Sequence, residues 1–222
     1  MLVLGFLISP GILTAQKLTL RLQPALSIPL GDFAAKNLDK GSFATAGFSG
    51  GGSLQWHLNT TWSINLQAAA TWHAIDIGEL GYKKVQQDPF LEDVYIRSEA
   101  FKNRMLLAGP VYTILLRDKI SINNSVAAGL MQSATPYQLY KPQYFMTGPN
   151  YYEITSARDY NFVWGVSTAL MYHFNTCYQL GFSAEWLHGN PVFTFTTANG
   201  LRFDERKISM LNLAMVFSVS LF

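Results

Sequence analysis

Residues 62–74 read W-S-I-N-L-Q-A-A-A-T-W-H-A, in which apolar and polar residues nearly alternate and a tryptophan stands near each end. Successive side chains of a β-strand point to opposite faces. One face of this segment therefore carries Trp62, Ile64, Leu66, Ala68, Ala70, Trp72 and Ala74, whereas the other carries Ser63, Asn65, Gln67, Ala69, Thr71 and His73.

The spacing of the two tryptophans fits the thickness of a membrane. Trp62 and Trp72 lie ten residues apart, which is roughly 33 Å at about 3.3 Å per residue. A strand tilt of about 40° reduces this to roughly 25 Å along the barrel axis, the height of the lipid-facing band of an outer-membrane barrel. Tryptophan prefers the membrane–water interface because its ring is apolar and its N–H needs a polar partner. The stretch therefore predicts a membrane-spanning strand with a girdle residue at each end.

Composition narrows the class of protein. The chain has 222 residues, of which 49% are hydrophobic and only 14% charged, against about 25% charged in typical soluble domains. No apolar run reaches the roughly 20 residues of a membrane helix. The apolar surface must lie in a soluble core or on strands that face lipid. The net charge of +2 comes without a basic stripe, so we expect no nucleic-acid partner.

The N-terminal segment 1–16, MLVLGFLISPGILTAQ, is interpreted as a secretory signal peptide. It combines an apolar stretch with small residues near a cleavage point at Ala15 or Gln16. Residues 17–222 then form one barrel domain. The single cysteine, Cys177, excludes an intrachain disulfide and a multi-cysteine metal site.

The same alternation recurs along the chain and predicts an all-β fold, an eight-stranded antiparallel up-and-down transmembrane barrel. The phase of the segment 104–116 stays open because it is apolar on both faces and contains Pro110. The predicted strands are Leu18–Leu30, Phe48–Leu58, Trp62–Ala74, Arg104–Leu116, Ile120–Gln132, Phe162–Asn175, Tyr178–His188 and Ile208–Phe222.

The connections between these strands alternate in length. Tight turns are expected at residues 59–60, 117–119 and 175–176, and long loops at about 31–47, 75–103, 133–160 and 189–207. Short periplasmic turns and long extracellular loops are typical of outer-membrane barrels. Of the fourteen acidic residues, only Glu185 falls inside a predicted strand, as the cost of a charge in lipid requires.

Two segments carry a resemblance to a known family. Ser27-Ile28-Pro29-Leu30-Gly31-Asp32-Phe33 ends the first predicted strand, and the glycine-rich Gly47-Phe48-Ser49-Gly50-Gly51-Gly52 opens the second. With them the chain resembles the outer-membrane β-barrel domain proteins of Bacteroidota, the broad group that includes PorT-like proteins. The resemblance implies a small surface barrel, with links to secretion or envelope integrity in some members. The terminal Phe222 is similar to the aromatic residue recognised by the barrel-insertion machinery, although it is out of phase with Phe217, Val219 and Leu221.

The strand phases also assign residues to the two surfaces of the barrel. Aromatic residues near the strand ends are expected in the membrane girdles: Trp56, Trp62, Trp72, Trp164, Tyr172, Tyr178 and Trp186. Polar residues are expected to face the lumen: Arg21, Gln23, Gln55, His57, Asn65, Gln67, His73, His173, Gln179 and Glu185. The lumen residues form a polar conduit or a proton-linked site or, in the interpretation that we favour, a hydrogen-bonded plug. Arg21 and Glu185 are expected at different depths, and a contact between His73 and Glu185 is a hypothesis.

Enzymatic chemistry is not expected. Small barrels that deacylate lipid A use a His-x-Ser pair followed by a glutamate, whereas here His173-Phe174-Asn175 lacks the hydroxyl that would attack. Four scattered histidines and one cysteine show no metal-ligand spacing, so neither a metal nor another cofactor is expected.

The loop 133–160 gives the best functional lead because it is rich in tyrosine. Tyrosine provides a large contact area with few rotatable bonds, as in binding loops. The alternative is that these rings extend the outer girdle or pack the loops together. The candidates for binding are Tyr137, Tyr140, Tyr144, Tyr151 and Tyr152. The loop 75–103 is charged and is interpreted as a solvated surface.

These observations predict an integral protein of the cell outer membrane with a structural, adhesion or surface-interaction role through its loops. The alternative is a narrow transporter or a lipid- or small-molecule-binding barrel, in the membrane or soluble like a lipocalin. The expected partners are outer-membrane lipid, the barrel-insertion machinery during biogenesis, and an extracellular or envelope protein.

Overall fold

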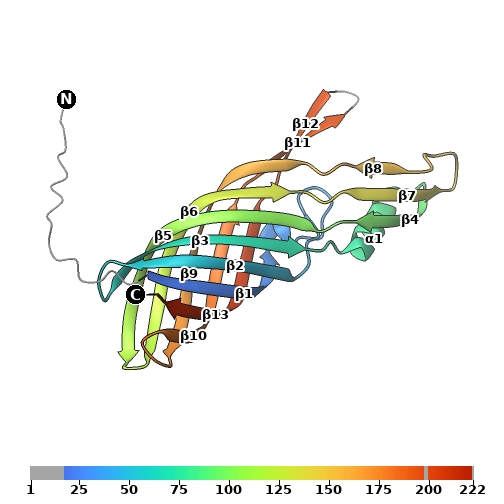
Figure 1. The fold of residues 1–222 in the computed structure, drawn as a ribbon. Helices are drawn as coiled ribbons and strands as arrows, with labels where there is room; N and C mark the ends of the chain where they lie inside the picture. Colours follow the sequence, from blue (N-terminus) through green and yellow to red (C-terminus); the bar gives the residue numbers. More distant parts are fainter. Residues whose placement is uncertain (1–17, 198–199, 222) are drawn as a thin grey trace, which may run out of the picture.

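The computed structural model describes residues 18–197 and 200–221, which form a closed barrel of eight antiparallel strands with an arm of long loops at one end (Figure 1). The predicted signal peptide 1–16 and the terminal Phe222 lie outside the described residues. The barrel strands are β1 (Leu18–Leu30), β2 (Gly47–His57), β3 (Trp62–His73), β5 (Phe101–Arg117), β6 (Ile120–Ala134), β9 (Arg158–His173), β10 (Tyr178–Gly189) and β13 (Ile208–Ser220).

The ring is closed between the first and the last strand. Neighbours around the barrel are β1-β13-β10-β9-β6-β5-β3-β2, and β2 returns to β1. Along the seam, Thr19 of β1 lies opposite Ser220 of β13, and Leu30 lies opposite Ser209. Closure leaves no sheet edge with unpaired backbone groups, which is the requirement for crossing hydrocarbon with strands. The predicted eight-stranded fold is confirmed.

The two faces of the strands follow the predicted alternation. Leu22, Leu66 and Leu130 point outward and are 53%, 48% and 63% exposed. Their inward neighbours are buried, among them Arg21 and Gln67 at 6% exposure each. Such a continuous apolar outer surface is stable in lipid and would aggregate in water.

Strand β5 settles the phase that the sequence left open. It spans 17 residues, from Phe101 to Arg117, and is therefore longer than the predicted segment. Met105, Leu107 and Val111 point inward and are buried, whereas Leu106 and Tyr112 face outward. The strand is apolar on both faces because its inner face fills the lumen.

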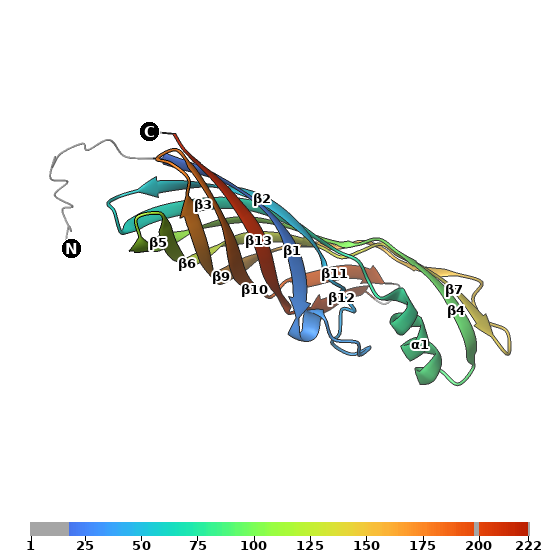
Figure 2. The same ribbon diagram turned by 90° about the horizontal axis from the view of Figure 1, so that it is seen from below.

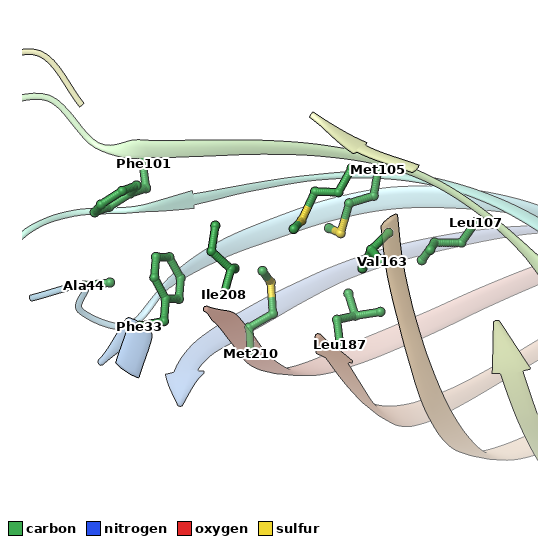
Figure 3. Packing of buried hydrophobic residues seen from close by; sticks show 10 residues of the cluster. Phe33, Ala44, Phe101, Met105, Leu107, Val163, Leu187, Ile208 and Met210 are labelled. Atoms are coloured by element: carbon green, nitrogen blue, oxygen red, sulfur yellow. The ribbon is translucent and has the colours of Figure 1, made fainter. Parts of the chain in front are cut away.

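Apolar side chains fill most of the outer half of the lumen (Figure 3), where the polar His73 is buried with them. Phe33 of the short 3-10 helix η1 (Gly31–Phe33) covers this plug and is fully buried. Its ring meets those of His73 and Phe101 edge-on, with centroids 5.1 and 5.4 Å apart. We call this cluster the apolar plug: Phe33, Ala44, Phe101, Met105, Leu107, Met131, Val163, Leu187, Ile208 and Met210.

The long connections contain regular structure that the sequence analysis treated as loops. A helix and two small sheets form there: α1 (Ile77–Gln87), β4 (Leu91–Ser98), β7 (Gln138–Tyr144), β8 (Tyr152–Ile154), β11 (Val192–Thr197) and β12 (Gly200–Glu205). Strands β4, β7 and β8 form one sheet, and β11 and β12 form the other. Helix α1 packs beside β4 (Figure 2).

This loop arm has a hydrophobic core of its own. Phe43, Leu80, Leu91, Val94, Ile96 and Tyr140 are buried together, although they come from three different loops. The loop 75–103 is therefore not only a solvated surface, because one side of α1 and of β4 contributes to this core. The expected tight turns join β2 to β3, β5 to β6 and β9 to β10. None of the helices in the described residues is long and apolar enough to span a membrane.

Candidate functional site

The periplasmic half of the lumen is polar and nearly solid. Two small cavities of about 20 and 10 Å³ lie near the middle of the lumen, and Gln67 and Glu185 line both. Each is close to the smallest space that holds a single water molecule. Together with the apolar plug above, this packing leaves a closed lumen in the described part of the chain, as expected for eight strands.

Glu185 is held by two amide donors from other strands. Gln67 Nε2 donates to its Oε1 at 3.0 Å, and Asn212 Nδ2 donates to its Oε2 at 3.2 Å. Small residues on the facing strands, including Gly51 and Ala69, give the carboxylate its space. Arg21 lines the larger cavity with Glu185, but the two form no ion pair within the described residues.

His73 and Glu185 do not touch, which corrects the hypothesis of a direct contact. Ser27 Oγ lies 3.1 Å from His73 Nε2 and donates to Asn212 Oδ1 at 2.6 Å, and Asn212 in turn donates to Glu185. The other imidazole nitrogen, His73 Nδ1, lies 3.0 Å from the carbonyl oxygen of Thr45. Sequence reasoning missed Ser27 and Asn212 as the linking residues, since strand alternation shows which residues face the lumen but not which of them meet.

The other two lumen histidines each meet a hydroxyl group on a neighbouring strand. His57 Nε2 lies 3.0 Å from Thr19 Oγ1, and His173 Nε2 lies 2.8 Å from Ser121 Oγ. Both lie near the periplasmic turns, away from His73. The histidines therefore do not converge on a common site, and their contacts tie strands together.

The aromatic residues assigned to the girdles lie on the outer surface in two groups. Trp56, Trp62, Tyr172 and Tyr178 lie near the tight turns, and Trp72, Trp164 and Trp186 lie near the long loops. Trp164 and Trp186 pack nearly perpendicular to each other with centroids 4.9 Å apart, and Trp62 packs on Tyr112 at 5.0 Å. Sequence reasoning did not place Tyr112 in the girdle because the phase of its strand was open.

The loop tyrosines divide into packed and accessible residues. Tyr140 is 1% exposed and stacks on Tyr152 with centroids 4.7 Å apart, and Tyr144 packs against the same core. The rings of these three residues help to build the core of the arm, and Tyr140 also lines the cavity described below, so their binding role stays a prediction. Tyr137 donates to Glu153, and Tyr151 is 65% exposed near the tip of the arm.

The distal tip of the arm is apolar and open to solvent. Phe90, Phe145 and Met146 are 61%, 70% and 73% exposed. The backbone N–H of Phe145 donates to the carbonyl oxygen of Phe90 at 3.1 Å, so the two turns that carry these side chains are joined. We call these three residues the distal tip. Its residues directly precede β4 and directly follow β7, two strands of the arm that extends from one end of the barrel (Figure 1).

A cavity of about 390 Å³ lies between the loops, above the apolar plug. All four long loops line it, through Phe43 of the first, Lys84 of the second, Glu153 of the third and Arg202 of the fourth, among others. Lys84 comes from α1, and its Nζ lies 4.8 Å from the ring centroid of Tyr140. Burial lowers the pKa of the Lys84 ammonium and raises the pKa of the Tyr140 hydroxyl.

No protein-family model and no curated protein matches the chain. In fold it is similar to Neisserial surface protein A, with a TM-score of 0.54 and 10% identity over 91% of this chain and 96% of that one. The outer membrane protein AlkL gives a TM-score of 0.50 with 11% identity over 92% of this chain and 90% of its own. The fold is that of the outer-membrane barrels. Together with the apolar belt, it places this barrel in the outer membrane.

Proposed function

We propose that this outer-membrane barrel serves a surface-interaction or adhesion role, in which the barrel is the anchor and the loop arm contacts an extracellular or envelope protein. The distal tip carries the proposal. Phe90, Phe145 and Met146 are exposed apolar side chains on a folded arm that extends from one end of the barrel. Apolar groups gathered in this way on a water-exposed surface are typical of protein-interaction sites.

The closed lumen favours this role over the transporter alternative. A conduit needs a continuous path, whereas the apolar plug fills the outer half of the barrel and Arg21, Gln67 and Glu185 crowd the rest. The soluble lipocalin-like alternative is disfavoured by the apolar outer surface, and the cavity between the loops supports small-molecule binding.

The remaining parts of the proposal concern biogenesis and chemistry. The chain is a substrate of the barrel-insertion machinery, carries no cofactor, catalyses no reaction and binds no nucleic acid. Its relation to the Bacteroidota barrel-domain proteins and to the PorT-like group is part of the proposal and depends on the segments Ser27–Phe33 and Gly47–Gly52.

Adherence of cells that produce the protein tests the role. The tip variant combines Phe90→Ser, Phe145→Ser and Met146→Ser. The matched control combines Leu201→Ser and Phe203→Ser, two apolar residues of β12 that are 64% and 65% exposed on a different loop. Heat-modifiable migration on gels verifies that each variant is folded. Antibody labelling of whole cells verifies that the variants are present at the cell surface in equal amounts.

We expect the tip variant to lose retention on a panel of immobilised matrix and envelope proteins and in cell–cell aggregation, and the control to retain it. Equal retention of wild type and tip variant would refute the role of the tip. A planar-bilayer recording tests the transporter alternative, because steady conductance by the wild-type barrel would favour a transporter over a surface-interaction role.

A further inference from the structure

The cavity between the loops contains a lysine whose charge has no counterpart. Lys84 Nζ lies over the stacked rings of Tyr140 and Tyr152, 4.8 and 5.8 Å from their centroids, and 3.4 Å from the Tyr152 hydroxyl. No carboxylate lies within ion-pair distance of it in the described part of the chain. A half-buried ammonium is costly unless something compensates it, and the ring faces do so only in part.

The other charges around the cavity are already engaged, apart from one arginine. Arg206 donates to Asp204 from Nε and Nη2 at 3.0 and 2.8 Å, and from Nη1 to the carbonyl oxygen of Gly41 at 2.8 Å. Glu153 accepts the hydroxyl of Tyr137. Arg202 also lines the cavity and has no ion-pair partner among the described residues. Three positive groups, Lys84, Arg202 and Arg206, and two negative groups, Glu153 and Asp204, thus line the cavity, which leaves one net positive charge.

Apolar and polar groups share the rest of the lining, and the apolar plug closes the cavity below. Phe43, Ile75, Leu80, Phe101 and Phe195 form walls, and Phe101 also belongs to the apolar plug. A volume of about 390 Å³ falls within the range of small-molecule sites, roughly 300–1,000 Å³. Because the plug blocks the way into the barrel, a molecule that enters from outside binds and leaves by the same route.

We propose that this cavity is a binding site for a small amphipathic anion, with an apolar body against the phenylalanine walls and one carboxylate, sulfate or phosphate group on Lys84, assisted by Arg202. The anion comes either from a free acid in the medium or from the head group of an anionic lipid beside the barrel. The cavity is separate from the distal tip, so the proposal of an anion site does not depend on the adhesion role.

Calorimetry on the full chain in nanodiscs tests the site. The probe is 2-naphthalenesulfonate, and neutral 2-naphthol has the same ring system without the charge. Empty nanodiscs provide the background. Lys84→Met removes the charge, and Lys84→Arg retains it. Lys83→Met is the matched control, because Lys83 is the next residue on the helix but faces Glu79, 3.9 Å from its Oε1.

We expect one saturable site per chain for the sulfonate and weaker binding of the naphthol. Lys84→Met should lower the affinity about tenfold, the contribution of one hydrogen bond to a charged group. Lys84→Arg and Lys83→Met should retain binding, which shows that the fold of the arm persists. Nanodiscs of phosphatidylcholine and of phosphatidylglycerol separate the two sources, since a lipid head group in the site would compete with the probe only in the second.

The proposal would be overturned if the sulfonate bound to the protein in nanodiscs no more strongly than to empty nanodiscs. Equal affinity for the sulfonate and the naphthol would also overturn it, as would an equal loss of affinity in Lys84→Met and Lys83→Met.

Discussion

His73 and Glu185 are the two ends of one hydrogen-bonded chain, in which Ser27 and Asn212 are the links. The chain crosses from β3 through β1 and β13 to β10, so it joins strands that are far apart in the sequence. It also connects the polar part of the lumen with the residue that covers the apolar plug, because the ring of His73 packs against Phe33. The polar lumen thus acts as a structural clamp between strands.

Ser27→Ala tests that clamp. The substitution removes the partner of His73 Nε2 and the donor to Asn212 Oδ1, and each buried polar group left unsatisfied costs about 1–3 kcal/mol. We expect a loss of free energy of unfolding of that order, measured by urea titration in lipid vesicles. The matched control is Ser53→Ala, because the buried Ser53 hydroxyl has no hydrogen-bond partner among the described residues. Equal losses in the two variants would contradict a clamp.

Phe33→Ala tests the cover of the plug. Phe33 is fully buried between His73 and Phe101, and truncation of a buried phenylalanine costs about 3–5 kcal/mol. We expect the outer ends of the barrel strands to lose protection against hydrogen exchange, while the strands near the tight turns keep theirs. Uniform loss of protection along every strand would mean that Phe33 stabilises the barrel globally and not as a local cover.

The N-terminus of α1 predicts a dependence on pH in the loop arm. Lys36 Nζ donates to Asp76 at 2.7 Å, and this contact together with the backbone N–H of Glu79 holds the pKa of the Asp76 carboxyl below its ordinary value of 3.8. Because the folded pKa is depressed, the stabilisation is present above that ordinary value and is lost as the pH falls through the lowered one. We expect hydrogen exchange in α1 to accelerate in that acid range.

Two variants separate the cap from the charge. Asp76→Ala removes the helix cap and should destabilise α1 by about 1 kcal/mol at neutral pH. Asp76→Asn retains the cap and should cost less, but the acid-dependent acceleration should disappear. The same acid response in Asp76→Asn as in wild type would assign the effect to another group.

The cost of placing a lysine on the lipid-facing surface is expected to depend on its depth in the membrane. Leu66 and Leu58 are similarly exposed, at 48% and 53%, but Leu66 lies in the middle of β3 and Leu58 lies at the turn that precedes it. Leu66→Lys should cost about 2–4 kcal/mol of unfolding free energy in vesicles, and Leu58→Lys about 0–1. Equal costs would contradict the assigned position of the membrane.

The barrel could be predicted from the sequence because lipid outside and a filled lumen inside impose a period of two on every spanning strand. The apolar plug could not be predicted in this way. Met131 and Leu187 face inward on strands whose outer residues are also apolar, so periodicity does not distinguish the two surfaces there.

The loop arm was missed for a different reason. Its core joins Phe43, Leu80 and Tyr140, which are distant in the sequence, and no local pattern shows that they meet. One local signal for α1 was present, since Asp76 and Glu79 have the spacing of a helix cap followed by an acidic third residue. The cavity at Lys84 depends on all four loops and had no signal in the sequence.

The pairing of β1 with β13 bears on how the molecule is made. Strand β1 can pair with β13 only after β13 has been synthesised, so the barrel cannot close before then. Until then the two edge strands of the open sheet expose unpaired backbone N–H and C=O groups, which favour aggregation with other chains. The pairing of the first barrel strand with the last is therefore the step that completes the ring.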